Sequence, residues 1–211
     1  MLEKHNLAII IPAYNEGMTI KKVIDSIPSD IEGINNIHII AIDDGSIDNT
    51  YPELIASKAT DIIKHDINRG LGVSFNDGVQ KAIELDVDYV INLDGDGQHS
   101  PSYIPKFVSL LLHQNCDIII GSRFINSSEA AMPKVKMIGN LFFSYVLSFL
   151  LKQKITDVTS GYRAYSKRIL HSISVETSFS YTIESLINIF KNNKGVQYSE
   201  IPIKVNPRWK I

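Results

Sequence analysis

The chain has 211 residues, of which 44% are hydrophobic and 21% are charged, and its formal net charge is −2. This is the composition of an ordinary globular domain, and the balance of charge gives no basis for nucleic-acid binding. The single cysteine, Cys116, excludes an internal disulfide and is typical of a cytoplasmic protein. We expect one domain over residues 1–211.

Short apolar runs predict the strands of a sheet. They are the segments 7–11, 38–43, 88–94 and 116–120. Runs that are apolar without alternation are typical of strands buried on both faces, as in parallel sheets. The segment 195–205 alternates and predicts an edge strand.

Helical patterns alternate with these strands. Apolar residues recur at helical spacing over 20–27, and Asn15 is the expected N-cap. A second helix is expected after Asp48 as its cap, a third over 70–85, and a buried one over 181–190. This alternation predicts an α/β fold, with a Rossmann-like, mainly parallel sheet flanked by helices.

Polar segments follow three of the predicted strands. They are "IPAYNE" (11–16), "DDGS" (43–46) and "DGDGQH" (94–99). Because the carboxyl ends of parallel strands meet at one edge of a sheet, where ligands bind, we expect one site there. Taken alone, the third segment is equally suited to a solvated turn, since Asp and Gly favour turns.

The residue types in these segments favour a nucleoside diphosphate. No G-x-G-x-x-G follows the first strand and G-x-x-x-x-G-K-[ST] occurs nowhere, so a dinucleotide fingerprint and a P-loop are excluded. Tyr14 and Glu16 suit stacking on a base and bonding a nucleoside, and Asp44 suits a ribose or base edge. Asp94 and Asp96 are placed to share one divalent cation with the ligand's phosphates.

Six motifs occur in a fixed order along the chain: "IPAYNE", "DDGS-x-D-x-T", "N-R-G-x-G", "D-G-D-G-Q-H-S-P", "GSRF" and "D-V-T-S-G-Y-R-A-Y". Their order resembles family 2 glycosyltransferases of GT-A fold, in the branch with dolichyl-phosphate mannose synthase and bacterial polyprenyl-phosphate sugar transferases. The resemblance implies one catalytic domain, with a nucleotide-binding half (1–99) and an acceptor-binding half (100–211). It also implies Mg²⁺ or Mn²⁺ as cofactor.

The resemblance assigns roles residue by residue. The nucleotide is expected to contact Pro12, Ala13, Tyr14, Glu16, Asp44, Asn68, Gly70 and Asp94. The metal is expected to contact Asp94, Asp96 and Gln98. The catalytic residues implied are Asp96, Asp157, Arg123 and Arg163, and the acceptor-binding residues are Arg123, Ser160 and Arg163. Relatives commonly continue into a basic loop, of which Arg208 would be the beginning.

Three of these polar side chains have plainer interpretations. Asp157 is also suited to cap a local turn, and Arg123 to form a surface salt bridge. We expect His99 to donate a hydrogen bond rather than to bind the metal.

The segment 133–154 is an apolar helix with lysines at both ends. Asn140, Ser144 and Ser148 recur at every fourth residue and form one narrow polar stripe. Such a helix is either buried in a core or lies at a lipid surface, and the flanking lysines favour the interface, where anionic headgroups attract them. No apolar run in the chain reaches the roughly 20 residues that span a bilayer.

The function expected is inverting transfer of a sugar from a GDP- or UDP-sugar to a polyprenyl or dolichyl phosphate. The protein would lie on the cytosolic face of a membrane, with a small membrane protein as one conceivable partner, and its oligomeric state stays open. Two alternatives remain at this point. One is a glycosyltransferase with a glycan or protein hydroxyl as acceptor, and the other is a non-catalytic protein that binds nucleotide sugars.

Overall fold

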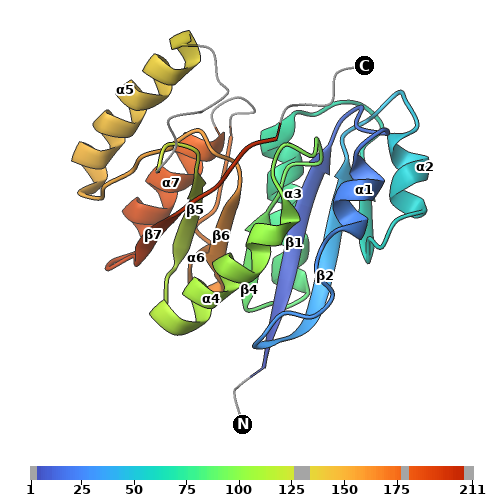
Figure 1. Cartoon of the computed structure of the whole chain (residues 1–211), viewed down its shortest axis with the longest axis horizontal. Coiled ribbons are helices and arrows are strands. Elements are labelled where there is room, and N and C mark those ends of the chain that lie inside the picture. Colours follow the sequence, from blue (N-terminus) through green and yellow to red (C-terminus); the bar gives the residue numbers. More distant parts are fainter. Residues whose placement is uncertain (1–3, 126–133, 177–180, 207–211) are drawn as a thin grey trace.

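The computed structural model describes residues 4–125, 134–176 and 181–206, which form a sheet with helices on both faces (Figure 1). Within these residues the sheet has seven strands in the order β3-β2-β1-β4-β6-β5-β7. The strands are β1 (His5–Ala13), β2 (Ile34–Asp43), β3 (Asp61–Lys64), β4 (Tyr89–Asn92), β5 (Ile118–Ser122), β6 (Arg163–Ser166) and β7 (Tyr198–Pro202). The four predicted buried strands and the predicted edge strand are confirmed.

The sheet is mainly parallel, as predicted. β1 pairs in parallel with β2 and β4, β2 with β3, and β5 with β7. β6 is the exception among the described strands, because it runs antiparallel between β4 and β5. β3 (DIIK) and β6 (RAYS) escape prediction because, unlike the equally short β4, each is interrupted by charged or polar residues and shows no apolar run.

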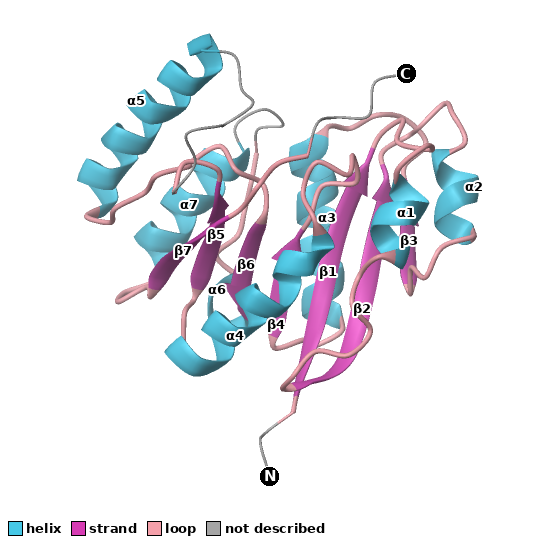
Figure 2. Ribbon diagram, in the orientation of Figure 1, coloured by secondary structure: helices cyan, strands magenta, loops and turns pink. Residues whose placement is uncertain are grey.

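Helices cover the two faces of the sheet (Figure 2). One face is covered by α1 (Ile20–Asp25), α2 (Thr50–Ile55) and α4 (Ile104–Gln114), which a short 3-10 helix (Pro101–Tyr103) precedes. The other is covered by α3 (Leu71–Glu84), α6 (Lys167–Leu170) and α7 (Tyr181–Asn192). A further helix, α5 (Lys134–Leu151), lies outside these layers at the upper left of Figure 1.

The central strand explains why the sheet needs cover on both faces. Leu7, Ile9 and Ile11 pack with α1, α2 and α4, whereas Ala8 and Ile10 pack with α3 and its neighbours. All five are fully buried. Successive side chains of a strand point to opposite faces, so an unbroken apolar run feeds two cores at once.

Two helix starts differ from the prediction. α1 begins after Thr19, not after Asn15, whose side chain instead accepts a hydrogen bond from the Ile47 amide. Asp48 precedes the N-cap position of α2 by one residue, although its Oδ1 accepts a hydrogen bond from the Thr50 amide at 2.9 Å. The prediction for Asn15 was wrong because the chain first makes a turn after β1, and the Asn15 side chain holds that turn to the next one.

Candidate active site

A cavity of about 950 Å³ opens at the carboxyl ends of β1, β2 and β4. It is lined by every residue predicted to bind nucleotide: Pro12, Ala13, Tyr14, Glu16, Asp44, Asn68, Gly70 and Asp94. Asp96 lies in the same wall, and α5 and α7 close the other side with Phe143 and Tyr181. The parallel sheet therefore gathers the three polar segments into one site, as the position of each after a strand predicted.

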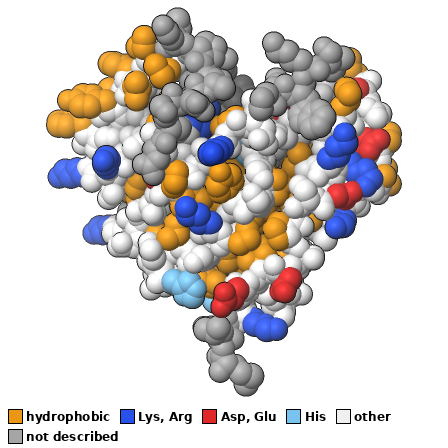
Figure 3. Space-filling model, in the orientation of Figure 1, with side chains coloured by type: hydrophobic (Ala, Val, Ile, Leu, Met, Phe, Trp, Pro, Cys, Tyr) orange, Lys and Arg blue, Asp and Glu red, His pale blue; other side chains and the backbone are white. Residues whose placement is uncertain are grey.

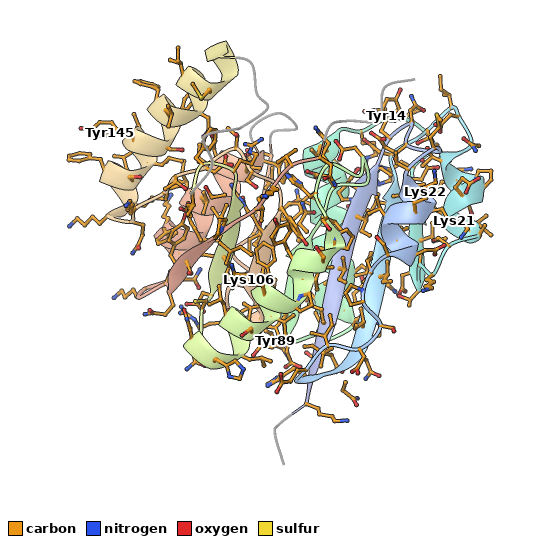
Figure 4. The ribbon with its side chains drawn as sticks, in the orientation of Figure 1. Tyr14, Lys21, Lys22, Tyr89, Lys106 and Tyr145 are labelled. Carbon is orange, nitrogen blue, oxygen red and sulfur yellow. The ribbon has the colours of Figure 1, made fainter. Side chains whose placement is uncertain are left out.

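The turn after β1 is fastened to the turn after β2. The Asn15 amide donates to Ser46 Oγ at 3.0 Å, and the Ile47 amide donates to Asn15 Oδ1 at 3.0 Å. Asn15 has a φ of 55°, a left-handed conformation that Asn tolerates better than most residues. As a result Tyr14, 43% exposed, stands beyond the end of β1 (Figure 4), and Glu16 lies in the cavity wall.

Asp44 is buried, and three donors fix its carboxylate. Oδ1 accepts from His65 Nδ1 at 2.7 Å and from the Arg69 amide at 2.8 Å, and Oδ2 accepts from the Gly70 amide at 2.8 Å. Burial alone would raise the pKa of Asp44, but these hydrogen bonds outweigh it and the pKa is lowered. The site thus holds an ionised acceptor in one orientation.

The loop that carries Asn68 and Gly70 approaches the β2 turn closely. A Cβ on Gly45, whose φ is +69°, would lie 2.3 Å from the carbonyl carbon of Ile67, so only glycine fits there. α3 begins directly after Gly70, and both Gly70 and Leu71 line the cavity. The positive end of the helix dipole therefore faces the cavity, an arrangement that favours phosphate.

Asp94 and Asp96 follow β4 on one turn. Burial, together with nearby Asp94 and Glu16, raises the pKa of Asp96, although the Gln98 amide donates to its Oδ1 at 2.9 Å. Burial first, and the neighbouring carboxylates second, disfavour the charged form of Asp96, and a bound divalent cation would offset both effects. Mg²⁺ typically takes one or two carboxylates plus substrate phosphates. The residues present fit such a shared site. Within the described ranges, no group of three or more His, Cys, Asp or Glu side chains is arranged to hold a metal by itself.

Two residues after this pair make contacts other than those predicted. Gln98 does not line the cavity; its backbone amide holds Asp96 and its backbone carbonyl accepts from the Asn206 amide, and its contact with a metal stays a prediction. His99 is buried against Tyr162, with ring centroids 5.4 Å apart. Its Nδ1 lies 3.2 Å from Asp94 Oδ2 but without hydrogen-bond geometry, so this ring nitrogen does not form the predicted hydrogen bond.

α5 packs on the protein with its polar stripe and exposes its apolar face, the reverse of an ordinary surface helix. Asn140 Oδ1 accepts from the Thr159 amide at 3.1 Å, and Ser144 Oγ accepts from the Val158 amide at 3.2 Å. Ser148 Oγ accepts from the Ile155 amide at 3.0 Å. The apolar side chains on the opposite face are exposed: Ile138, Leu141, Phe142, Phe143, Tyr145, Phe149 and Leu150.

This arrangement overturns the core-helix alternative. The outward face is visible as hydrophobic surface at the upper left of Figure 3, and Figure 4 shows Tyr145 pointing away from the protein. Phe143 joins this face to the cavity wall. None of the helices in the described part of the chain is long and apolar enough to cross a membrane. The side chains of the first lysines of the segment, Lys134 and Lys136, and the whole of Arg208 lie outside the described residues.

Asp157 and Arg123 pair with each other. Arg123 Nε and Nη2 donate to the two carboxylate oxygens of Asp157 at 2.6 and 2.7 Å, and Nη2 also donates to Thr159 Oγ1 at 2.7 Å. The Asp157 side chain is fully buried, whereas that of Arg123 is 18% exposed. Asp157 is therefore placed to orient Arg123, and its direct action on sugar or acceptor stays a prediction.

Arg163 and Ser160 are structural in this fold. The fully buried guanidinium of Arg163 donates to the carbonyl oxygens of Ser160, Val158 and Thr182 at 2.7–2.8 Å. Ser160 is 1% exposed and does not line the cavity. Neither side chain lines the cavity, so the structure gives no support to the two predicted acceptor contacts, which stay predictions. The cause is that β6 begins at Arg163 and runs into the sheet, which turns the side chain under the loop.

Among the residues that sequence reasoning missed, His65 and Tyr181 contribute most clearly to the site. His65 holds Asp44, and its only local signal is its position directly after a short strand. Tyr181 lines the cavity, and burial and nearby Asp94 raise its pKa well above the ordinary value, so its hydroxyl remains a donor at neutral pH. A Cβ on Gly161 would lie 2.5 Å from the Tyr181 hydroxyl, so Gly161 lets that group approach Asp94. No short-range pattern links Tyr181 to the acidic turn.

Sequence comparison places the chain among sugar transferases. It is 36% identical over 216 residues to the UDP-N-acetylglucosamine–dolichyl-phosphate N-acetylglucosaminyltransferase of Methanococcus voltae, covering 93% of this chain and 84% of that protein. It is 29% identical over 205 residues to a dolichyl-phosphate hexose transferase of Haloferax volcanii (96% and 84% covered). A third relative is the polyprenol monophosphomannose synthase of Mycolicibacterium smegmatis, 26% identical over 208 residues (95% and 77% covered).

Structural comparison and a family model agree with this placement. Glucosyl-3-phosphoglycerate synthase from Mycobacterium tuberculosis, solved with Mn²⁺, UDP and glucosyl-3-phosphoglycerate, superposes with a TM-score of 0.73 at 21% identity, covering 97% of this chain and 73% of that one. This likeness shows the fold, which is GT-A. The family model described as "Glycosyl transferase family 2" matches residues 8–174. The chain therefore belongs to glycosyl transferase family 2, as the order of its motifs predicted.

Proposed function

We propose that this protein transfers a hexose from a UDP-sugar to a polyprenyl phosphate at a membrane surface, with inversion at the anomeric carbon. The observation that carries the proposal is the cavity, where Tyr14, Asp44 and the pair Asp94 and Asp96 stand together. These groups suit a base, a nucleoside and a diphosphate in turn. Three relatives are named for a dolichyl or polyprenyl lipid, which supports a lipid acceptor.

Asp44 favours uracil over guanine. A carboxylate has about four lone-pair positions. Three of those on Asp44 are taken by His65, Arg69 and Gly70, which leaves one on Oδ2. Uracil offers a single ring N–H, whereas the edge of guanine offers an N–H and an amino group side by side and needs two free acceptors. The relative from Methanococcus voltae is also named for a UDP-sugar donor.

The diphosphate would lie between the acidic turn and the start of α3. Asp94 and Asp96 would hold Mg²⁺ or Mn²⁺, which when bound supplies charge stabilisation to the departing diphosphate. Mn²⁺ accompanies UDP in the glucosyl-3-phosphoglycerate synthase structure. The amino end of α3 at Gly70 adds a favourable dipole.

The chemistry needs no strong base in the protein. The bond from a phosphate oxygen to the anomeric carbon forms while the bond to the UDP oxygen breaks, and UDP leaves with the electron pair. Because the attacking oxygen is already anionic, no proton has to be removed. The burial of Asp157 against Arg123 agrees with this, since that carboxylate is used to orient a cation. Arg123, whose side chain is 18% exposed, would then meet the incoming phosphate beside the cavity rather than within its lining.

The outward face of α5 is proposed to lie on the cytosolic surface of a membrane. Its exposed side chains include Phe142, Tyr145 and Phe149, and exposed Lys152 and Lys154 follow the helix. Apolar side chains beside lysines suit the boundary between acyl chains and anionic headgroups. Phe143 belongs both to this face and to the cavity wall, so a lipid phosphate held at the surface would enter beside the donor.

The test of transfer is a panel of donors with one lipid acceptor. The protein is incubated with UDP-glucose, UDP-N-acetylglucosamine or GDP-mannose, with Mg²⁺ or Mn²⁺, and with a polyprenyl phosphate, and lipid-linked sugar is measured. A UDP-sugar is expected to give product and GDP-mannose none. Parallel reactions with a polyprenol and a soluble glycan address the hydroxyl acceptors, and product only with these would overturn the proposal. Nucleotide binding without any turnover would support a non-catalytic protein instead.

The test of membrane docking is cosedimentation with vesicles. Binding to vesicles that contain anionic lipid, and weaker binding to neutral vesicles, is expected. If pure lipid vesicles of either kind fail to bind the protein, the apolar face is covered by something else, and a small membrane protein becomes the better candidate.

A further inference from the structure

His65 lies behind the wall of the cavity and bridges two carboxylates. It follows β3 directly, is 6% exposed, and does not line the cavity itself. Its Nδ1 is 2.7 Å from Asp44 Oδ1, and its Nε2 is 2.9 Å from Asp77 Oδ2. The connection therefore runs from the cavity through Asp44 and the imidazole to α3, which carries Asp77.

The geometry makes the ring a donor toward Asp44. An ionised carboxylate only accepts hydrogen bonds, so the ring nitrogen facing Asp44 must carry a proton. Asp77 on the far side fixes the plane of the ring, and Arg69 Nη1 in turn lies 3.4 Å from the same Asp77 oxygen. The His65 amide also donates to the Asp43 carbonyl at 2.9 Å, which ties the backbone of His65 to the end of β2.

We propose that His65, oriented by Asp77, is a positioning residue that fixes the Asp44 carboxylate for the nucleoside. The inference rests on the proposed function, because it takes Asp44 as the group that binds the base. His65 and the Arg69 amide together fill Oδ1, and the Gly70 amide takes one position on Oδ2, so the remaining lone pair of Asp44 lies on Oδ2. His65 thereby helps to set both the direction of the acceptor and the number of donors that the acceptor can take.

The test is the affinity for UDP, measured by calorimetry on the full chain, in three substitutions of His65. His65→Leu removes both hydrogen bonds, and UDP is expected to bind roughly tenfold more weakly, as for the loss of one hydrogen bond to a charged group. His65→Gln places its amide near Nε2 and is expected to behave like His65→Leu. His65→Asn places its amide near Nδ1, can still donate to Asp44, and is expected to stay within about threefold of the wild type.

The same variants separate a positioning role from a structural one. In the transfer reaction the KM for the donor is expected to rise with the dissociation constant, while kcat at saturating donor stays within about twofold of the wild type. His5→Leu is the matched control, because His5 also faces a carboxylate, Asp88, at 3.7 Å, but at the opposite end of β1. It is expected to leave UDP affinity unchanged.

Two outcomes would overturn the inference. One is UDP affinity that is equal in the wild type and in His65→Leu. The other is a kcat that falls in step with thermal stability in all three variants, with no rescue by Asn. Failure of the proposed function looks different, because the wild type itself would then give no lipid-linked product from a UDP-sugar, whatever the His65 variants do to UDP affinity.

Discussion

The two halves of the molecule use their charged side chains in opposite ways. In residues 4–99, Glu16, Asp44, Asp94 and Asp96 all line the cavity, and the pKa of Asp96 is raised by burial and by its acidic neighbours. In the later half, several buried or half-buried charged groups are paired within the protein. Arg123 binds Asp157, and Glu200 accepts from the amide and hydroxyl of Thr156 at 2.8 and 2.6 Å.

The difference shows where each half meets its ligand. The nucleotide half places polar groups in the wall of a cavity that suits a charged, hydrophilic donor. Carboxylates held close together there lower the stability of the folded protein. The acceptor half turns its polar groups inward to hold α5 and the 155–163 loop, and leaves an apolar surface outside. A lipid acceptor needs an apolar surface and a single phosphate contact, so few polar groups are required there.

The largest effect is expected from Asp96→Asn, which tests the nucleotide half. Transfer should fall at least about a hundredfold, because charge stabilisation of the leaving diphosphate is lost. Mn²⁺ with UDP should raise the melting temperature of the wild type but not of the variant, and chelation should reverse the shift. Asp30→Asn, at an exposed position, serves as the control. Turnover retained in Asp96→Asn with the metal chelated would contradict the assignment.

Arg163→Met tests whether the charged side chain of Arg163 stabilises the fold rather than binding a ligand. The three carbonyl oxygens that Arg163 satisfies would be left buried without donors, and the free energy of unfolding should drop by about 3 kcal/mol. Transfer per folded molecule should stay near the wild-type value. Lys106→Met, on the exposed side of α4, should change neither quantity. A stable but inactive Arg163→Met would restore the phosphate role that burial argues against.

Substitutions on the two sides of α5 sharpen the contrast in apolar surface. Phe149→Ser, at a position 78% exposed, should change the free energy of unfolding by less than about 0.5 kcal/mol and weaken vesicle binding about tenfold. Leu147→Ala, at a position 4% exposed, should cost about 2 kcal/mol or more and leave vesicle binding intact. Equal vesicle binding by Phe149→Ser and the wild type would argue against docking through this face.

The smallest effect is expected in the pH dependence of stability, measured without metal, which should have opposite signs for Asp117 and Asp96. Burial alone would raise the pKa of Asp117, but hydrogen bonds from Arg168 and the Gln197 amide outweigh it and lower the pKa. The ionised carboxylate therefore stabilises the fold at pH values above its ordinary pKa of 3.8. The stability advantage of the wild type over Asp117→Asn should therefore shrink as the pH falls below 3.8. Asp96 has a raised pKa, so Asp96→Asn should be more stable than the wild type at neutral pH. That gain should disappear as the pH falls through the raised pKa toward 3.8. Urea unfolding across pH measures both, and slopes of the same sign would contradict the contrast.

The sequence by itself determined the buried strands of the sheet and the nucleotide side of the site. An unbroken apolar run such as 7–11 has to be buried on both faces, and parallel strands bring their carboxyl ends to one edge. Residues that directly follow such strands, such as Tyr14, Asp44 and Asp94, therefore had their positions fixed by a local pattern and a general rule. Asn68 and Gly70 were placed by their motif, which the family resemblance supplied.

Only the tertiary structure decided which polar side chains of the loops reach the cavity. The orientation of a loop side chain depends on hydrogen-bond partners far away in the sequence. Arg163 donates to the Thr182 carbonyl, the Thr159 amide donates to Asn140, and Asp44 accepts from His65. The same reason explains α5, whose sequence showed a polar stripe but not which way it turned. A stripe of Asn and Ser faces inward when backbone amides there need acceptors, and the 155–159 loop supplies those amides.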